Sequence, residues 1–200
     1  MSLAPPPLAQ FIRAIETLTG SGLNEIDVLR GGRRLLAELV SRDDWLPDAF
    51  SKPAVERYRQ YLLFRDPRAR FSLVSFVWGP GQSTPIHDHT VWGLVGVLRG
   101  AEASQRYRIS PSGAPVEHGP PDRLERGAVE AVSPTVGDIH RVSNALADRA
   151  SISIHLYGAD IGAVRRWVYS PSGDRKPFTS GYDNSDANPP FVLDGVEQAA

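Results

Sequence analysis

The first third of the chain places apolar residues at helical spacing. Five of them recur at intervals of three or four positions before Gly20: Leu8, Phe11, Ile12, Ile15 and Leu18. This spacing predicts an amphipathic helix that ends near the glycine. Asn24 is a good N-cap for a second helix, whose apolar stripe continues to Val40. The Gly31–Gly32 pair is a candidate break in that second helix.

Beyond residue 60 the hydrophobic pattern changes to short, often alternating runs. They occur at 61–64, 71–78, 91–98, 103–109, 129–132, 138–142, 151–157 and 164–169. Many short strands with turn residues between them favour a β-sandwich or barrel. Residues 111–127 are rich in Pro, Gly and charge, so we expect an exposed hairpin or loop there.

These patterns predict one domain with three parts. Pro53 is expected to open a short third helix that ends at about residue 59. We therefore expect a helical cap at 8–59 and a β-barrel at 60–172. Residues 173–200 are polar and rich in Pro and Gly, and we expect a tail that wraps the barrel or is partly disordered.

Charge and composition narrow the classes of function. The 200 residues include 22 basic and 23 acidic ones, for a net charge of −1, and no long basic run. We therefore expect no nucleic-acid partner and no anionic membrane surface. The sequence has neither a long apolar run nor a secretory leader pattern, so we expect a cytoplasmic protein. Without cysteine the chain has no disulfide, thiolate ligand or cysteine nucleophile.

Two histidines separated by one residue give the first candidate chemistry. His87 and His89 lie between Gly81 and Gly100, two glycines that we expect in tight turns. On a β-strand, residues i and i+2 point to the same face, and His is the commonest metal ligand. The pair therefore predicts half of a metal site. The segment resembles the first motif of the cupin family, a small antiparallel barrel, except that Gly93 stands where many cupins have a Glu.

A second segment supplies a third histidine. Residues 137–144 resemble the second cupin motif, which places His140 across the barrel interior from the first pair. The two motifs together indicate one metal site, with the ligands His87, His89 and His140. Asp88 and Asp138 are candidates for orienting these histidines or for capping turns.

Gly93 has two interpretations. Loss of the cupin carboxylate makes the site more cationic, which favours an anionic ligand such as a thiolate on the metal. Alternatively, the glycine marks a bulge or a close approach of another group to the strand.

Residues 151–157 alternate strictly between polar and apolar. The polar face carries Ser151, Ser153, His155 and Tyr157. Such a face is costly inside a barrel unless it lines a wet or reactive cavity. The alternative is an edge strand whose polar face meets solvent. The three histidines favour the cavity.

With these motifs, residues 55–172 resemble the thiol dioxygenases, namely cysteine dioxygenase and its bacterial relatives that act on 3-mercaptopropionate. The resemblance implies a three-histidine Fe(II) site that adds both atoms of O2 to a thiol sulfur and gives a sulfinate. It also implies that Tyr157 places its hydroxyl near the substrate or oxygen, that His155 orients Tyr157, and that Ser153 hydrogen-bonds His155.

Two departures from the animal cysteine dioxygenases bear on the substrate. Those enzymes carry a cysteine that crosslinks to the active-site tyrosine, and this chain has Gly93 at the equivalent place. They also bind the substrate carboxylate with an arginine where this chain has Gln60. A Gln there is similar to the mercaptopropionate-type enzymes, in which an arginine after the Ser-His-Tyr strand meets the carboxylate. Arg166 has the matching spacing, and we expect its neighbour Arg165 to face outward.

The resemblance therefore implies a thiol dioxygenase with one Fe(II) per chain and O2 as co-substrate, which we expect to be a monomer or small homo-oligomer. The expected substrate is a small thiol carboxylate: 3-mercaptopropionate first, then mercaptosuccinate or cysteine. One alternative is a cupin dioxygenase or isomerase acting on a non-thiol substrate, which a fourth ligand at His155 would favour. The other is a non-catalytic cupin that binds a metabolite or stores metal.

Overall fold

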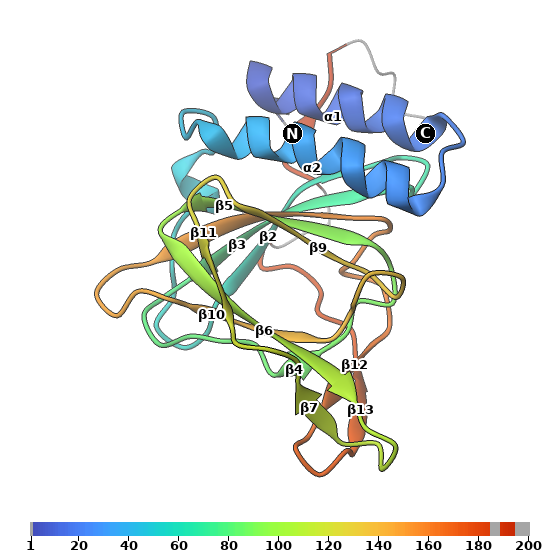
Figure 1. The fold of residues 1–200 in the computed structure, drawn as a ribbon. Coiled ribbons are helices and arrows are strands. Elements are labelled where there is room, and N and C mark those ends of the chain that lie inside the picture. Colours follow the sequence, from blue (N-terminus) through green and yellow to red (C-terminus); the bar gives the residue numbers. More distant parts are fainter. Residues whose placement is uncertain (1, 185–188, 195–200) are drawn as a thin grey trace.

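Two antiparallel sheets face each other to form a barrel, and two helices cover one of them (Figure 1). The computed structural model describes residues 2–184 and 189–194. The first sheet contains, in spatial order, β2 (Arg59–Arg65), β3 (Ser72–Trp78), β11 (Ser151–Tyr157), β5 (Gly93–Arg99) and β9 (Val129–Val132). The second contains β13 (Arg175–Phe178), β12 (Arg166–Tyr169), β4 (Ile86–His87), β10 (His140–Asn144), β6 (Ala101–Ile109) and β7 (Pro115–Glu117), with β8 (Asp122–Glu125) paired to β6. The predicted mainly-β barrel with an N-terminal helical cap is confirmed.

The two cap helices are α1 (Pro6–Gly20) and α2 (Glu25–Ser41). Asn24 caps α2, because its side-chain oxygen accepts a hydrogen bond from the Asp27 N–H at 3.0 Å. The two glycines do not break α2. A Cβ at Gly31 would lie 2.9 Å from Leu18 of α1, and one at Gly32 would lie 2.8 Å from Leu94 of β5. The glycines therefore let α2 approach the neighbouring helix and the sheet closely.

The predicted third helix at 53–59 is wrong. The nearest helical turn is a short 3-10 helix, η1 (Asp48–Phe50), and β2 begins at Arg59. Between them, the Ala54 carbonyl accepts a hydrogen bond from the Gln82 side chain at 2.8 Å. This partner from a distant loop takes a carbonyl that a helix would need for its own ladder.

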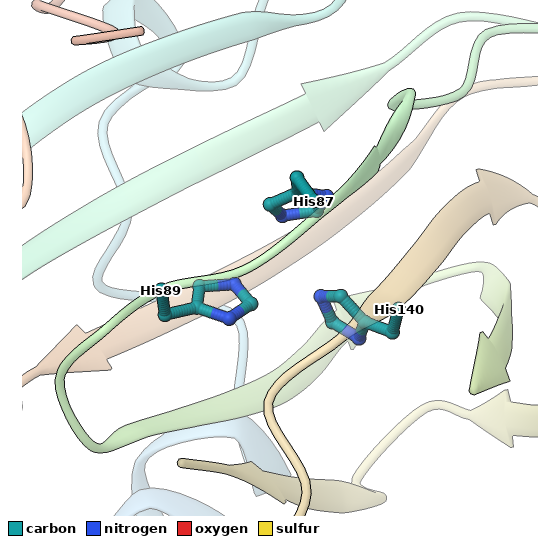
Figure 2. A group of neighbouring side chains, drawn as sticks. All are labelled: His87, His89 and His140. Carbon is teal, nitrogen blue, oxygen red and sulfur yellow. The ribbon is translucent and has the colours of Figure 1, made fainter. Parts of the chain in front are cut away.

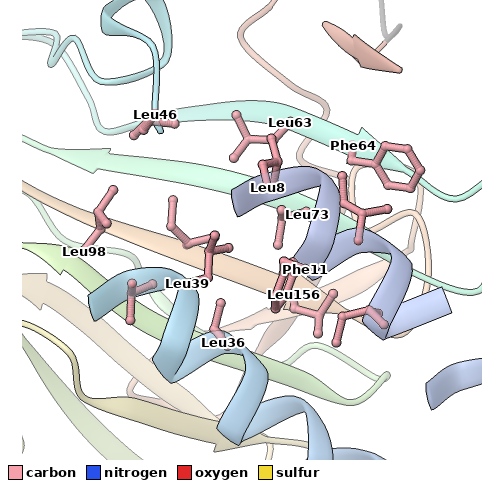
Figure 3. Packing of buried hydrophobic residues seen from close by; sticks show 14 of the residues in the cluster. Leu8, Phe11, Leu36, Leu39, Leu46, Leu63, Phe64, Leu73, Leu98 and Leu156 are labelled. Atoms are coloured by element: carbon pink, nitrogen blue, oxygen red, sulfur yellow. The ribbon is translucent and has the colours of Figure 1, made fainter. Parts of the chain in front are cut away.

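The main hydrophobic core lies between the helices and the outer face of the first sheet (Figure 3). Leu8 and Leu36 from the helices and Leu73 and Leu156 from the strands are fully buried in it. Burial of each such side chain contributes about 1.5–3 kcal/mol. The apolar face of β11 therefore packs on the cap, and its polar face turns toward the barrel interior.

The position of β11 decides between the two interpretations of its alternating pattern. It pairs with β3 on one side and with β5 on the other, and all seven of its residues are buried. A strand with neighbours on both sides is not an edge strand. The solvent-facing alternative is therefore wrong.

The segment after the barrel adds two further strands. β13 pairs antiparallel with β12, and β14 (Phe191–Val192) pairs parallel with β1 (Ser2–Leu3). The predicted tail at 173–200 thus lies against the barrel and the N-terminus over part of its length, and its residues 185–188 and 195–200 lie outside the described chain. No helix among the described residues is both long and apolar enough to cross a membrane.

Candidate active site

Three histidines from two distant segments converge inside the barrel (Figure 2). One ring nitrogen from each lies within 4.8 Å of the others, and all three residues are buried. His87 ends β4 and is paired in register with His140, the first residue of β10. His89 lies beyond the regular strand, in a turn where Thr90 has a φ of 60°. The pair therefore does not share a continuous strand, although both rings reach the same cluster.

Each imidazole is held at Nδ1 by a group outside the cluster. His87 Nδ1 lies 3.1 Å from the Pro85 carbonyl, and His140 Nδ1 lies 3.3 Å from the Ser104 hydroxyl. His89 Nδ1 lies 3.0 Å from a carboxylate oxygen of Asp138. With Nδ1 engaged, the second ring nitrogen, Nε2, is the one left to bind a metal.

The electrostatics of the cluster favour neutral imidazoles. Burial, reinforced by the nearness of His89, lowers the pKa of both His87 and His140 well below the usual histidine value. A neutral imidazole is the form that binds a metal ion. Three such donors suit a divalent first-row metal and leave further coordination positions open. The residues present therefore fit a mononuclear metal centre.

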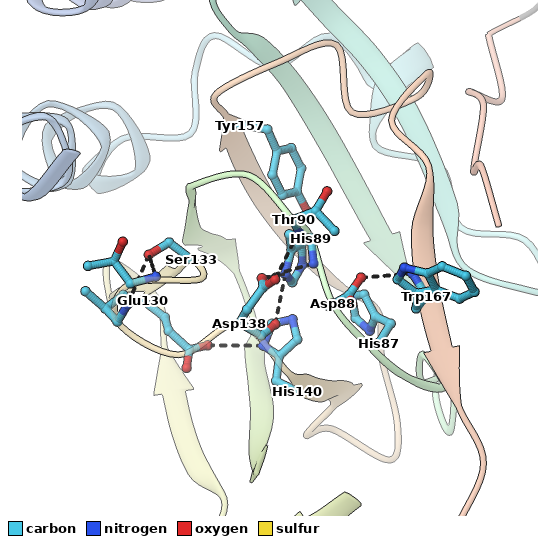
Figure 4. A network of polar contacts seen from close by, with 12 residues as sticks. His87, Asp88, His89, Thr90, Glu130, Ser133, Asp138, His140, Tyr157 and Trp167 are labelled. Atoms are coloured by element: carbon cyan, nitrogen blue, oxygen red, sulfur yellow. Dashed lines mark hydrogen bonds and ion pairs between the residues drawn. The ribbon is translucent and has the colours of Figure 1, made fainter. Parts of the chain in front are cut away.

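Asp138 and Asp88 have different hydrogen-bond partners and therefore different roles (Figure 4). Asp138 accepts the backbone N–H groups of His89 and Thr90 at 3.0 and 2.9 Å, in addition to its contact with the His89 ring. It thereby stabilises the strained positive φ of Thr90 and orients a candidate ligand. Asp88 instead accepts the Trp167 N–H at 2.8 Å and the Tyr169 hydroxyl at 2.7 Å, and so joins the histidine segment to β12.

The inward face of β11 carries a continuous chain of hydrogen bonds. Ser153 Oγ lies 2.8 Å from His155 Nε2, and His155 Nδ1 lies 2.7 Å from the Tyr157 hydroxyl. The Tyr157 ring stacks on His89 with ring centroids 5.6 Å apart. Both nitrogens of His155 are used in this chain, so the geometry does not make His155 a fourth ligand. Burial raises the pKa of the Tyr157 hydroxyl above its usual value, which keeps a proton on it.

Gly93 lies directly against this tyrosine. A Cβ at position 93 would come within 2.8 Å of Tyr157 Cδ1 and 3.1 Å of Val132. No side chain fits there while Tyr157 keeps its position. The close-approach interpretation of Gly93 therefore holds, and it accounts for the missing cupin carboxylate in steric terms.

One cavity of about 150 Å³ joins the histidines to two candidate substrate-binding residues. Gln60 from β2 and Arg166 from β12 both line it, together with Tyr157. Arg166 is only 3% exposed, donates to the Ser180 hydroxyl at 2.6 Å and lies over the Phe178 ring at 4.5 Å.

The neighbouring arginines point elsewhere. Arg165 is exposed and lies 5.5 Å from the Trp167 ring. Arg59 and Arg65, the two ends of β2, form ion pairs with acidic residues that do not line the cavity. Arg166 is therefore the arginine placed to meet a ligand of the cavity.

The stretch that carries these features also matches a known family. Residues 37–170 match cysteine dioxygenase type I, and they include all three histidines and the whole of β11. This chain belongs to the cysteine dioxygenase type I family. Family membership makes the protein a thiol dioxygenase by class, with a small thiol as substrate and three histidines for a metal.

Solved structures of cupin-type proteins are similar at low identity. A protein with a double-stranded β-helix domain from Klebsiella pneumoniae matches with 14% identity and a TM-score of 0.45, over 68% of this chain and 97% of its own. An RmlC-like cupin protein from Desulfovibrio desulfuricans matches with 19% identity and a TM-score of 0.40, over 58% of this chain and 95% of its own.

Some residues of the cavity lie outside the family match and were not foreseen. Phe178 and Ser180 reach it from the segment after β12. The sequence did hold a signal for them, since the turn residues Ser170 to Gly173 separate two short runs and predict a hairpin. His118, by contrast, is exposed and does not line the cavity.

Proposed function

We propose that this protein is an Fe(II) thiol dioxygenase whose substrate is a small thiol with a carboxylate, 3-mercaptopropionate before mercaptosuccinate or cysteine. The observation that carries the proposal is a buried arginine, Arg166, in the same cavity as three candidate metal ligands. A thiol at one end and a carboxylate at the other would complete both ends of that cavity.

Arg166 supports a carboxylate because it is a buried cation without an acidic partner in the described chain. No Asp or Glu there forms an ion pair with it, and its Nε has no hydrogen-bond partner among the same residues. Burial lowers the pKa of Arg166, which expresses the cost of holding this charge away from water. A bound carboxylate would supply the missing counter-charge through two parallel hydrogen bonds.

The residues that line the cavity support the proposed order of the three thiols. None of the described residues that line it is acidic, so the ammonium group of cysteine would lack a counter-charge and would lie in a site that already holds Arg166. Mercaptosuccinate carries a second carboxylate, but Arg166 is the one cationic side chain among those lining residues. 3-Mercaptopropionate has neither extra charge, and the neutral amide of Gln60 can add a hydrogen bond to its single carboxylate.

The proposed mechanism assigns each residue one task. Bound Fe(II) would supply the coordination positions and the electrons that bring thiolate and O2 together. Arg166 and Gln60 fix the carboxylate, which sets the distance of the sulfur from His87, His89 and His140. Tyr157 directs its hydroxyl toward the reacting atoms, and His155 and Ser153 hold that hydroxyl in place.

The experiment is anaerobic loading with Fe(II), followed by oxygen uptake and sulfinate analysis with each of the three thiols. We expect one O2 consumed per sulfinate formed, and the highest kcat/KM with 3-mercaptopropionate. Arg166→Ala should raise KM strongly and alter metal content little, whereas Arg165→Ala should leave both unchanged. Absence of uptake with every thiol despite bound iron would contradict the proposal and favour a cupin enzyme with a non-thiol substrate.

A further inference from the structure

A buried carboxyl group stands on the sheet opposite β11, the strand whose hydrogen-bonded side chains Ser153, His155 and Tyr157 are called the relay below. Glu102 of β6 has no exposed surface and lies opposite Asn144 of β10 in the register. Neither of its carboxylate oxygens has a hydrogen-bond partner among residues 2–184 and 189–194. A fully buried carboxyl without a partner is rare in folded proteins and calls for a reason.

The polar groups that face Glu102 belong to the inner end of the relay. The Ser153 hydroxyl and the Trp78 indole both lie near enough to act on its ionisation. Trp78 Nε1 donates to Ser153 Oγ at 3.2 Å, and that oxygen lies 2.8 Å from His155 Nε2. Glu102 therefore stands at the end of the chain farthest from Tyr157.

The hydrogens available to this chain restrict its arrangement. The Trp78 indole can only donate, so it occupies one acceptor position of Ser153. Ser153 has a single hydrogen to donate, and that hydrogen goes either to His155 or to Glu102. The choice at Ser153 then sets the direction of every later hydrogen bond, because His155 in its neutral form carries one N–H.

We propose that Glu102 is a positioning residue of the relay: it stays protonated and, by a small movement that closes the gap left between the two side chains in the structure, donates a hydrogen bond to Ser153. Ser153 then donates to His155 Nε2, and His155 donates from Nδ1 to the Tyr157 oxygen. The phenolic hydrogen of Tyr157 is left to point into the cavity, as a proton donor must. This inference rests on the proposed function, because it concerns the role of Tyr157 in thiol oxidation.

An ionised Glu102 would reverse the chain. Ser153 would donate to the carboxylate, His155 would donate from Nε2 to Ser153, and Tyr157 would donate to His155, so that only lone pairs of its oxygen would face the cavity. Burial, and after it the nearby carboxylate of Glu130, raises the pKa of Glu102 to about 8, although Ser153 and Trp78 oppose the rise. The protonated form is therefore the major one at neutral pH.

The test compares the wild type with Glu102→Gln, whose amide can still donate to Ser153 but cannot ionise, and with Glu102→Met, which cannot donate. The readout is kcat with 3-mercaptopropionate as a function of pH. Ionisation of the substrate and of other groups affects the kcat of all three proteins equally, so it cancels when the kcat of a variant is divided by that of the wild type. We expect the ratio of Glu102→Gln to wild type to rise about tenfold from pH 7 to pH 9, as the wild-type carboxyl ionises.

Glu102→Met removes the acceptor together with the donor, so Ser153 keeps His155 as its acceptor and the ratio of kcat in Glu102→Met to that in the wild type should also rise from pH 7 to pH 9. In a Tyr157→Phe background, exchange of Glu102 for Gln should have no further effect on kcat. A ratio that stays flat with pH would overturn the proposal.

A second readout needs no turnover. The infrared C=O stretch of a protonated carboxyl group should be present in the wild type at neutral pH, fade at alkaline pH, and be absent from Glu102→Gln. If the wild type oxidises no thiol, the proposed function fails while this band still reports the state of Glu102. If an active wild type lacks the band at neutral pH, the relay inference fails and the proposed function stands.

Discussion

The two walls of the cavity reach their geometry by different means. The metal-ligand wall consists of His87, His89 and His140, and the relay wall consists of Ser153, His155 and Tyr157. On the metal-ligand wall each ring is held from outside by its own partner: a carbonyl, a carboxylate and a hydroxyl. On the relay wall the three side chains come from one central strand and hold one another.

The two walls should therefore respond differently to the loss of one side chain. Loss of one support on the metal-ligand wall affects one ring and leaves the other two supports in place. Loss of one member of the relay wall leaves its neighbours without a partner, so the effect passes along the strand. The following substitutions test that distinction, beginning with the largest expected effect.

His89→Ala removes a candidate ligand and should lower both bound metal and thiol oxidation to background. Three imidazoles are needed because the cluster offers no carboxylate in their place. Metal per chain, measured by elemental analysis beside oxygen uptake, gives the result. His118→Ala is the matched control, since that histidine is exposed, and it should retain both. Full metal content in His89→Ala would remove His89 from the ligand set.

Tyr157→Phe should lower kcat on the order of a hundredfold and leave metal content unchanged, because it removes a proton donor but no ligand. Steady-state kinetics with metal analysis on the same sample measures both. Tyr107→Phe, on β6 and outside the cavity, is the control. Undiminished activity of Tyr157→Phe on all three thiols would show that the relay has no catalytic part.

Asp138→Ala should weaken metal binding about tenfold to a hundredfold, because it removes the group that orients the His89 ring and holds the Thr90 turn. Competition with a chelator of known affinity measures the change. Asp88→Ala lies in the same segment but removes contacts to β12 instead. We expect it to lower the free energy of unfolding with a smaller change in metal affinity. Equal metal affinities of the two variants would contradict the separate roles of the two carboxylates.

Glu102→Gln should have the smallest effect on turnover at neutral pH but a clear effect on stability. The pKa of Glu102 is raised to about 8 in the folded state. Between the ordinary glutamate pKa and pH 8, the folded wild type therefore keeps a proton that the unfolded chain has already released. The free energy of unfolding of the wild type is therefore highest below the unfolded-state pKa of Glu102. It falls as pH rises toward 8, by about 1 kcal/mol for each pH unit. Denaturant unfolding at several pH values should therefore show that the stability of Glu102→Gln relative to the wild type increases from pH 5 to pH 8. Parallel curves would mean that Glu102 is already ionised.

Local spacing was enough to find most of the candidate site. The His-x-His pair and the alternation through Ser153, His155 and Tyr157 are visible within a few residues of sequence. Arg166 was identified by a resemblance, because its spacing after the relay strand matches that of the mercaptopropionate-type enzymes. Each of these positions depends on the period of a strand or on the loop beside it, and the sequence carries that information directly.

Long-range pairing accounts for what was missed. Glu102 was overlooked because the predicted strand began at 103, and its burial comes from pairing of β6 with β10 and β8. The false helix at 53–59 failed because Gln82, from another loop, takes the Ala54 carbonyl. Neither contact leaves a periodic trace, so neither could be read from one sequence.

The hairpin formed by β12 and β13 has a further consequence for which substitutions can alter the cationic end of the cavity. Ser180 and Phe178 hold the cationic end of the cavity, yet the family match ends at residue 170. Arg166 itself lies inside the family match, whereas the two residues that hold its guanidinium lie beyond it. Substitutions in the hairpin would therefore change how the Arg166 guanidinium is held while the histidines and the relay stay as they are.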